Sequence, residues 1–316
     1  MHPRLMLEDP DRPIPRRPFG GTGLRVSVIG FGAASYWGQR LFSERLAVRL
    51  VHEAVASGVN LFDTGSSYSG GNAEPRLGRA LASLDRSDLV ISSKVGTRLD
   101  RWGRAHKDFR PDRIRSVVER SLRNLGLERL PLLHLHGPSL GHLGAELLDC
   151  LERLRDEGLV RFLGVNSFDL DVIARAGELD LFDSLMVDYN VLRRDREPLI
   201  ASLHRAGKAV LAAGALAGAV IGNRLLRARG PRDAWYLLRA LRHRRRDVRR
   251  GLSYRFIGRI PGWSAAQVAL GFVLANPHVS TAMIGTTSLE HLRENLAAAS
   301  RSLPEAVLAR IRSVGR

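Results

Sequence analysis

The sequence lacks the features of secreted and membrane proteins. Its longest apolar run, residues 209–222, is shorter than the roughly 18 residues that a membrane-spanning helix requires. Residues 1–21 carry charges and prolines where a signal peptide has an apolar core. Cys150 is the single cysteine, so no disulfide can form within the chain. We therefore expect no membrane partner and a location in the reducing cytoplasm.

Lysine is also scarce, although the chain is strongly basic. Of the 49 basic residues only Lys94, Lys107 and Lys208 are lysines, and the formal net charge is +17. Such a charge is typical of nucleic-acid-binding proteins. The sequence nevertheless shows no helix-turn-helix spacing and no basic motif interleaved with aromatic residues. We therefore expect no nucleic-acid partner.

The densest basic cluster, 241–250, lies within residues 219–262, which we interpret as an inserted basic segment. A solvated basic helix is the simplest interpretation of this cluster. Attraction of an anionic substrate or cofactor is an alternative, and binding to nucleic acid or acidic lipid is another.

Lys94 differs from the other two lysines in its surroundings. It ends the apolar run 89–94, which is typical of a buried strand leaving a sheet, whereas Lys107 and Lys208 lie in polar, loop-like segments. Arginine does not deprotonate in a protein, but the ε-ammonium of lysine is compact and its pKa shifts on burial. A lysine at this position indicates a need for a small, tunable cation.

Strand-like and helical patterns alternate along the chain with great regularity. Short apolar strands, each followed by a helix, predict an α/β fold with parallel strands, and eight such units predict a (β/α)8 or TIM barrel. Residues 1–316 would then form a single domain, with a flexible arm at 1–19, an N-terminal hairpin before the first strand, and long loops at the carboxyl-terminal face. The expected strands lie at 28–33, 60–65, 89–96, 132–137, 161–167, 184–189, 209–215 and 280–287. The expected helices lie at 43–58, 74–84, 112–125, 144–158, 169–177, 197–206, 263–276 and 289–301.

A Rossmann domain is the competing α/β prediction, because Gly30 and Gly32 follow a strand in a G-x-G pattern. Ser35 stands where the fingerprint has its third glycine. Asp63, the next acidic residue at a strand end, comes later than the roughly 20 residues expected for a ribose ligand. The barrel is therefore favoured.

Four polar residues lie at or just beyond the ends of expected strands two, three and four. Asp63, Lys94 and His136 each end a strand, and Tyr68 follows Asp63 by five positions. Each has an ordinary structural interpretation, as a cap, a packing residue or a satisfied interior histidine, and the last also applies to His134 on the same strand face. A barrel brings these strand ends side by side. Together they indicate a set of groups for proton transfer.

The chemistry of this set follows from the ionisation of its members. A phenol has a pKa of about 10, and a nearby cation lowers it by favouring the phenolate. Lys94 would supply that cation, and a buried ammonium in turn requires a carboxylate, for which Asp63 is the candidate. A neutral His136 would orient the substrate oxygen. Such an arrangement suits the protonation of an alkoxide as it forms.

At these residues the chain resembles the aldo-keto reductase superfamily, and the likeness extends over nearly all of the sequence. On strand seven the chain has the small residues Ala212 and Ala213, and in this it resembles the aldose dehydrogenase branch of the family. The resemblance implies a TIM barrel that binds NADP(H) without a Rossmann domain, with Tyr68 as general acid/base. The segments that carry it include 62–81, 92–96, 135–138, 158–168 and 269–296.

The resemblance also implies where the cofactor binds, with NADP(H) favoured over NAD(H). Asn166 and Ser167 stand, in inverted order, where the family holds the nicotinamide carboxamide, and Met186 replaces a glutamine. Thr287 and Glu290 have the spacing of a capping box at the start of a helix that can bind a phosphate. The expected cofactor-binding residues are Asn166, Ser167, Gly285, Thr286, Thr287, His291, Glu294 and Asn295.

We expect an oxidoreductase that transfers hydride between a nicotinamide cofactor and a small carbonyl or alcohol compound. The arginine-rich loops 97–110 and 219–262 favour a sugar-like or anionic substrate, and Trp37 is a candidate substrate contact. An NAD(P)+-dependent aldose 1-dehydrogenase and a non-catalytic, cofactor-sensing subunit are the alternatives. No spacing of the ten histidines indicates a metal site, and nothing specifies an oligomeric state.

Overall fold

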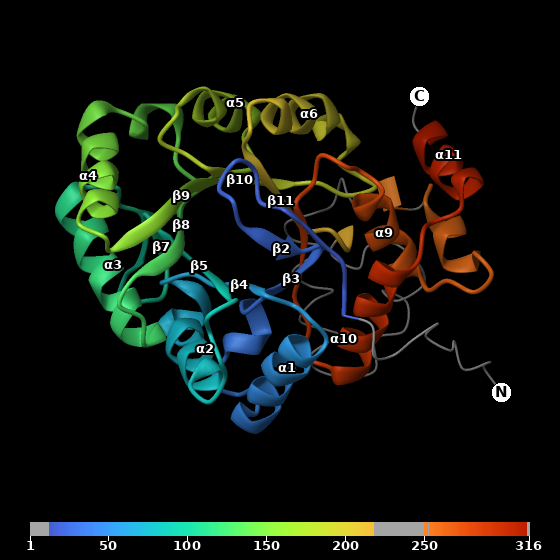
Figure 1. Cartoon of the computed structure of the whole chain (residues 1–316), viewed down its shortest axis with the longest axis horizontal. Helices are drawn as coiled ribbons and strands as arrows, with labels where there is room; N and C mark the ends of the chain where they lie inside the picture. Colours follow the sequence, from blue (N-terminus) through green and yellow to red (C-terminus); the bar gives the residue numbers. More distant parts are fainter. Residues whose placement is uncertain (1–12, 218–249, 252, 315–316) are drawn as a thin grey trace.

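The computed structural model describes residues 13–217, 250–251 and 253–314. At its centre eight parallel strands form a closed barrel, in which each strand pairs with the next barrel strand along the chain and the last pairs with the first (Figure 1). The predicted (β/α)8 fold is therefore confirmed. The barrel strands are β3 (Ile29–Gly32), β4 (Leu61–Asp63), β5 (Val90–Val95), β8 (Leu130–His136), β9 (Val160–Asn166), β10 (Ser184–Asp188), β11 (Ala209–Ala213) and β12 (Thr281–Ile284).

Helices surround the barrel and cover its outer face (Figure 1). Sequence signals set their ends: α3 begins at Pro111, whose fixed φ suits a first helical turn, and stops at Gly126, which adopts a left-handed φ of 63°. The helices after successive strands are α1 (Glu44–Ala56), α2 (Ala73–Leu81), α3 (Pro111–Leu125), α4 (Ala145–Asp156), α5 (Leu170–Glu178), α6 (Glu197–Arg205), α9 (Ala265–Leu274) and α10 (Leu289–Leu296).

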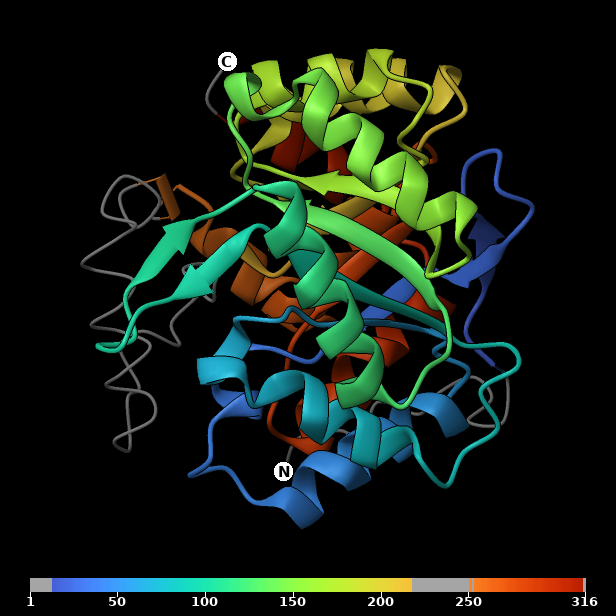
Figure 2. The same ribbon diagram turned by 90° about the vertical axis from the view of Figure 1, so that its left-hand side faces the viewer.

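A hairpin and a helix of the described chain were not anticipated. The loop expected at 97–110 contains an antiparallel hairpin of β6 (Thr97–Leu99) and β7 (Ala105–Lys107), which projects from the barrel in Figure 2. A further helix, α11 (Glu305–Ser313), follows α10, and the expected helix at 289–301 ends in a 3-10 turn at Ala297–Ser300. The hairpin matters most, because it lies beside the strand ends that carry the candidate site.

The N-terminal hairpin closes the opposite end of the barrel. Strands β1 (Arg16–Pro18) and β2 (Arg25–Ser27) pair antiparallel, as expected. Phe19 and Val26 are fully buried and belong to a core cluster with residues that begin barrel strands, such as Leu61. Residues 13–19, expected in a flexible arm, are thus part of the fold, and the rest of that arm lies outside the described residues.

The inserted segment predicted at 219–262 is described only in its last part, which contains a 3-10 turn at Arg255–Arg259. Of the basic cluster 241–250, Arg250 alone falls within the described residues. In the part of the chain that the structure describes, no helix is both long and apolar enough to cross a bilayer.

Candidate active site

Asp63 and Lys94 form a buried ion pair at the carboxyl ends of β4 and β5. The Lys94 ammonium donates to Asp63 Oδ2 and, at 2.8 Å, to the carbonyl oxygen of Thr64. The Lys94 side chain is 1% exposed and the Asp63 side chain 8%. Burial lowers the pKa of Lys94, but its interactions with the Asp63 carboxylate and with Tyr68 outweigh burial and raise that pKa above its ordinary value. Lys94 is therefore an ammonium at neutral pH.

Tyr68 lies over this ion pair because the loop after β4 is tied to β5. Ser66 donates through its hydroxyl to the carbonyl of Lys94 at 2.8 Å, and the Tyr68 amide donates to the carbonyl of Gly65 at 2.9 Å. A Cβ atom on Gly65 would lie 3.3 Å from the Tyr68 ring, so the absence of a side chain there lets the ring approach the loop closely. The Lys94 ammonium nitrogen is 4.9 Å from the centre of the Tyr68 ring.

The ionisation of Tyr68 differs from the sequence-based expectation. Lys94 lowers the pKa of Tyr68, as expected, through its charge and a hydrogen-bond interaction. Burial is the larger effect, and together with the charge of Asp63 it raises the pKa of Tyr68 above its ordinary value. Tyr68 is consequently a protonated phenol at neutral pH, the form in which a hydroxyl donates a proton.

His136 stands against Tyr68 at the end of β8. The ring centres are 5.4 Å apart and the ring planes are nearly perpendicular, at 83°. Burial, followed by the charges of Lys94 and Lys107, lowers the pKa of His136 to about 3. His136 is therefore neutral at physiological pH, as expected. The Thr97 hydroxyl lies 3.2 Å from its Nδ1 atom.

The structure thus brings together the four side chains that the sequence singled out, whose catalytic roles stay a prediction.

His134, two residues before His136, is a different kind of residue. It is fully buried, and its two ring nitrogens lie 3.0 Å from Ser92 Oγ and 3.1 Å from Ser184 Oγ. It is the satisfied interior histidine that was one interpretation of this motif.

The nucleotide end of the predicted cofactor site contains polar atoms that suit a ligand. Thr287 and Asn295 are 5% and 3% exposed, and the oxygen atoms Thr287 Oγ1 and Asn295 Oδ1 have no hydrogen-bond partner within the described residues. Because buried polar atoms are nearly always hydrogen-bonded, this pair fits a bound polar group such as a nucleotide. Four other predicted residues of this end lie in the same turn and helix: Gly285, Thr286, His291 and Glu294.

The predicted capping box of Thr287 and Glu290 is wrong. Helix α10 is capped instead by Ser288, whose hydroxyl accepts from the backbone N–H of His291 at 3.4 Å. Thr286 Oγ1 accepts from the backbone N–H of Ser288 at 3.2 Å and so holds the preceding turn. The serine takes the capping position that spacing alone assigned to Thr287, and this leaves the threonine hydroxyl available.

The nicotinamide end has the expected residues at the carboxyl end of β9. Asn166 Nδ2 is 3.4 Å from the carbonyl oxygen of Met186, and Ser167 Oγ accepts from the backbone N–H of Asp169 at 3.2 Å. Met186 stands opposite Asn166 in the register of β9 and β10 and is buried in an apolar cluster. Trp37, a candidate substrate contact, is only 1% exposed, and its indole N–H has no partner among the described residues. Its contact with substrate stays a prediction.

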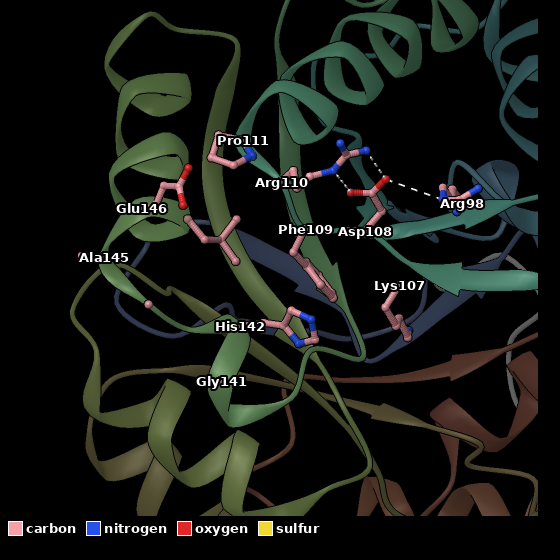
Figure 3. A pocket seen from close by; sticks show the side chains of 12 residues that line it. Arg98, Lys107, Asp108, Phe109, Arg110, Pro111, Gly141, His142, Ala145 and Glu146 are labelled. Atoms are coloured by element: carbon pink, nitrogen blue, oxygen red, sulfur yellow. Dashed lines mark hydrogen bonds and ion pairs between the residues drawn. The ribbon is translucent and has the colours of Figure 1, made fainter.

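A groove of about 630 Å³ lies next to this site, between the hairpin and the start of α4 (Figure 3). Asp108 pairs within it with Arg110 at 2.9 Å and with Arg98 at 3.6 Å. Lys107 also lines the groove, and its ammonium donates to the carbonyl oxygen of His136. The groove and the candidate active site therefore share Lys107.

The model of the family described as "Aldo/keto reductase family" matches residues 28–316. The chain belongs to the aldo/keto reductase family. It is accordingly an oxidoreductase of a family that uses nicotinamide cofactors.

Relatives with different named activities resemble the chain over most of its length. It is 31% identical to an L-galactose dehydrogenase of Arabidopsis thaliana, over 89% of this chain and 87% of the relative. It is 26% identical to an NADH-specific methylglyoxal reductase of Escherichia coli, over 92% and 94%. Among solved structures, an aldo-keto reductase of Bacillus halodurans in its holo form is 25% identical and covers 96% of this chain and 97% of its own, with a TM-score of 0.78.

Residues around the four-residue set were missed by reasoning from sequence. Ser92, Ser184 and Thr97 are ordinary residues whose partners come from other strands, so no local pattern marks them. Lys107 did carry a signal, since it is one of three lysines, but its loop-like surroundings concealed its contact with His136.

Replacement of Lys94 by Met should lower the free energy of unfolding by about 3–5 kcal/mol, because it leaves the Asp63 carboxylate buried without a counter-ion. The double variant Asp63→Asn, Lys94→Met should lose less than the single variant. Urea unfolding measures both values. Arg175→Ala, which breaks an exposed pair with Glu178, serves as control and should cost at most about 1 kcal/mol. Equal losses for Lys94→Met and Arg175→Ala would contradict the energetic role given to the buried pair.

Proposed function

We propose that this protein transfers hydride between a nicotinamide cofactor and the carbonyl or alcohol carbon of a small, hydrophilic compound, with Tyr68 as the general acid/base. One observation carries the proposal: a phenol lies beside an ammonium that is itself buried and paired with a carboxylate. A non-catalytic, cofactor-sensing role would not require this arrangement. The intact set therefore favours an enzyme.

The residues would act on the oxygen of the substrate. Bound nicotinamide supplies hydride to the carbonyl carbon in reduction and accepts it in oxidation. As the carbon–oxygen double bond becomes single, the oxygen gains negative charge, and the Tyr68 hydroxyl gives it a proton. Lys94 stabilises the phenolate that remains, and neutral His136 donates a hydrogen bond that orients the oxygen. In oxidation the phenolate takes the proton back.

The cofactor would lie across the carboxyl ends of the strands. Asn166 and Ser167 would hold the carboxamide of the nicotinamide, and Thr287 and Asn295 would contact the nucleotide end, where their oxygens lack partners among the described residues. We favour NADP(H) over NAD(H), because the resemblance implies it and the net charge of +17 favours an additional phosphate. The Escherichia coli relative that is named as NADH-specific is 26% identical to this chain, so NAD(H) is the alternative.

The substrate would be sugar-like or anionic. The groove beside His136 presents Lys107 and His142, whereas its two arginines, Arg98 and Arg110, are paired with Asp108. The Lys107 ammonium donates to Thr97 and to the His136 carbonyl oxygen but has no carboxylate partner within the described residues, so it suits hydroxyl or acidic groups on a small carbonyl compound. The L-galactose dehydrogenase among the relatives favours a second candidate function, the NAD(P)+-dependent oxidation of an aldose at C1.

Tyr68→Phe should lower kcat by at least about 100-fold while the Kd for cofactor stays nearly unchanged, because only the proton donor is removed. Steady-state kinetics and fluorescence titration with NADPH measure the two quantities. Tyr36→Phe, on the first loop, is the matched control and should keep wild-type rates. A Tyr68→Phe variant with wild-type turnover would show that another group is the acid.

Lys94→Arg should also lower kcat by at least about 100-fold, although the positive charge is kept. The guanidinium is a wide planar fork that does not fit the compact site formed by Asp63 and the Thr64 carbonyl. Lys208→Arg is the control, because Lys208 is another buried lysine but donates to the carbonyls of Leu179 and Phe182. Comparable activity of the two variants would contradict the requirement for a small cation.

A substrate panel measured with all four cofactor forms separates the two directions. We expect turnover of sugar-like or acidic carbonyl compounds with NADPH, at a higher kcat/KM than with NADH. A higher kcat/KM for aldoses with NADP+ or NAD+ would establish the aldose dehydrogenase alternative. Turnover confined to uncharged aromatic aldehydes would contradict the hydrophilic substrate.

A further inference from the structure

The two histidines of β8 lie between hydrogen-bonding groups whose donor and acceptor roles are fixed by chemistry. His134 and His136 are two residues apart and face the same side of the strand. A neutral imidazole carries its proton on either Nδ1 or Nε2, and the other nitrogen accepts. The surrounding groups determine which nitrogen carries the proton in each ring.

The first ring belongs to a chain of buried side chains that ends at Asp63. The carboxylate of Asp63, paired with Lys94, can only accept, so the Ser92 hydroxyl donates to its Oδ1 atom at 3.0 Å. Ser92 has a single hydroxyl proton and must therefore accept from His134 Nδ1, which is 3.0 Å away. The other nitrogen, Nε2, then accepts from the Ser184 hydroxyl at 3.1 Å.

The barrel register makes this chain possible. His134 and Ser184 both stand opposite Gly164 of the intervening strand β9. A Cβ atom on Gly164 would lie 2.4 Å from Ser184 Oγ and 2.6 Å from His134 Cδ2. The missing side chain therefore lets the serine reach the histidine across a whole strand.

The second ring has the opposite arrangement. Lys107 comes from the β6–β7 hairpin, and an ammonium can only donate: it donates to Thr97 Oγ1 at 3.2 Å and to the His136 carbonyl oxygen. The proton of the Thr97 hydroxyl is thus available to His136 Nδ1 at 3.2 Å, while the carbonyl oxygen is farther, at 3.5 Å, and already accepts from Lys107. His136 Nδ1 accepts, and its proton lies on Nε2.

Gly96 allows the hairpin to reach this position. It follows β5 directly with a left-handed φ of 90°, and a Cβ atom there would lie 2.0 Å from the Phe109 ring. No other residue type fits between that ring and the backbone. The turn at Gly96 places Thr97 beside His136.

We propose that His134 and His136 are neutral and held in opposite tautomers, Nδ1–H in His134 and Nε2–H in His136, with Thr97 and Lys107 as positioning residues for the latter. The catalytic consequence rests on the proposed function. An Nε2–H group in His136 gives the substrate oxygen a donor, whereas the Nδ1–H tautomer would present a lone pair and repel it. The chain through His134 directs three hydrogen bonds toward Asp63 and stabilises the carboxylate that holds Lys94.

Nitrogen NMR of the full chain labelled with 15N-histidine tests the tautomers. In neutral imidazole the bare nitrogen resonates far downfield of the protonated one, and long-range proton couplings identify which is which. His134→Gln and His136→Asn assign the two rings among the ten histidines. We expect Nδ1–H for His134 and Nε2–H for His136 at pH 7. The same tautomer in both rings, or a protonated imidazolium in either, would overturn the proposal.

Matched variants test the groups that set the tautomers. In Thr97→Val, His136 should no longer be held in the Nε2–H tautomer, and kcat/KM should fall about tenfold, the loss of one hydrogen bond. The Kd for NADPH should stay unchanged. Thr97→Ser, which keeps the hydroxyl, should restore the Nε2–H tautomer and kcat/KM. In Ser92→Ala, His134 should no longer be held in the Nδ1–H tautomer. Ser93→Ala is the control and should leave that tautomer unchanged, because the Ser93 hydroxyl donates to Glu74. Wild-type nitrogen shifts in Thr97→Val and Ser92→Ala would overturn the proposal.

The nitrogen shifts are read without turnover, so the two proposals fail separately. An active Tyr68→Phe variant would contradict the proposed role of Tyr68 and leave the tautomer proposal untouched. Identical tautomers of His134 and His136 in an enzyme that depends on Tyr68 would contradict only the tautomer proposal.

Discussion

A buried ion pair lies at the carboxyl ends of the barrel strands, and removing either of its charges alone is strongly unfavourable. The Lys94 ammonium is buried, and the Asp63 carboxylate, the Thr64 carbonyl oxygen and the Tyr68 hydroxyl replace the water it has lost. Such a pair contributes little net stability, because desolvation of both ions offsets their attraction. Its value lies elsewhere: it fixes a positive charge beside a phenol in a place where solvent cannot screen it. The loop that carries Tyr68, the strand that carries His136 and the chain from Ser184 are all arranged around this pair.

Burial and charge act in opposite directions on Tyr68, and the balance suits proton donation. A phenolate at rest would have no proton to give, while an isolated buried phenol would hold its proton too tightly. Burial keeps the hydroxyl protonated, and Lys94 lowers the cost of the phenolate once the proton has left. The same two residues can therefore serve both directions of a hydride transfer.

Much of the architecture was accessible from the sequence, because it depends on local patterns. Alternating strand and helix periods predict the (β/α)8 fold, and strand-end positions single out Asp63, Lys94 and His136. Local backbone geometry and contacts between distant segments were not accessible. Ser288 rather than Thr287 caps α10 because of backbone geometry at the helix start, and spacing alone does not distinguish the two. The position of Trp37 in the core and the hairpin at 97–107 likewise depend on packing that a single sequence does not display.

The hairpin of β6 and β7 contacts both the groove and a residue at a strand end, two places that usually have separate functions in a barrel enzyme. In most enzymes of this architecture, loops choose the substrate and strand ends perform the reaction. Here one loop lines the groove with Lys107 and also contacts His136, with Thr97 at its ring and the same lysine at its carbonyl oxygen. If the groove binds the substrate as proposed, a change in this segment that adapts the enzyme to a new compound would also alter the surroundings of His136. Substrate selectivity and reaction rate would then both depend on this hairpin.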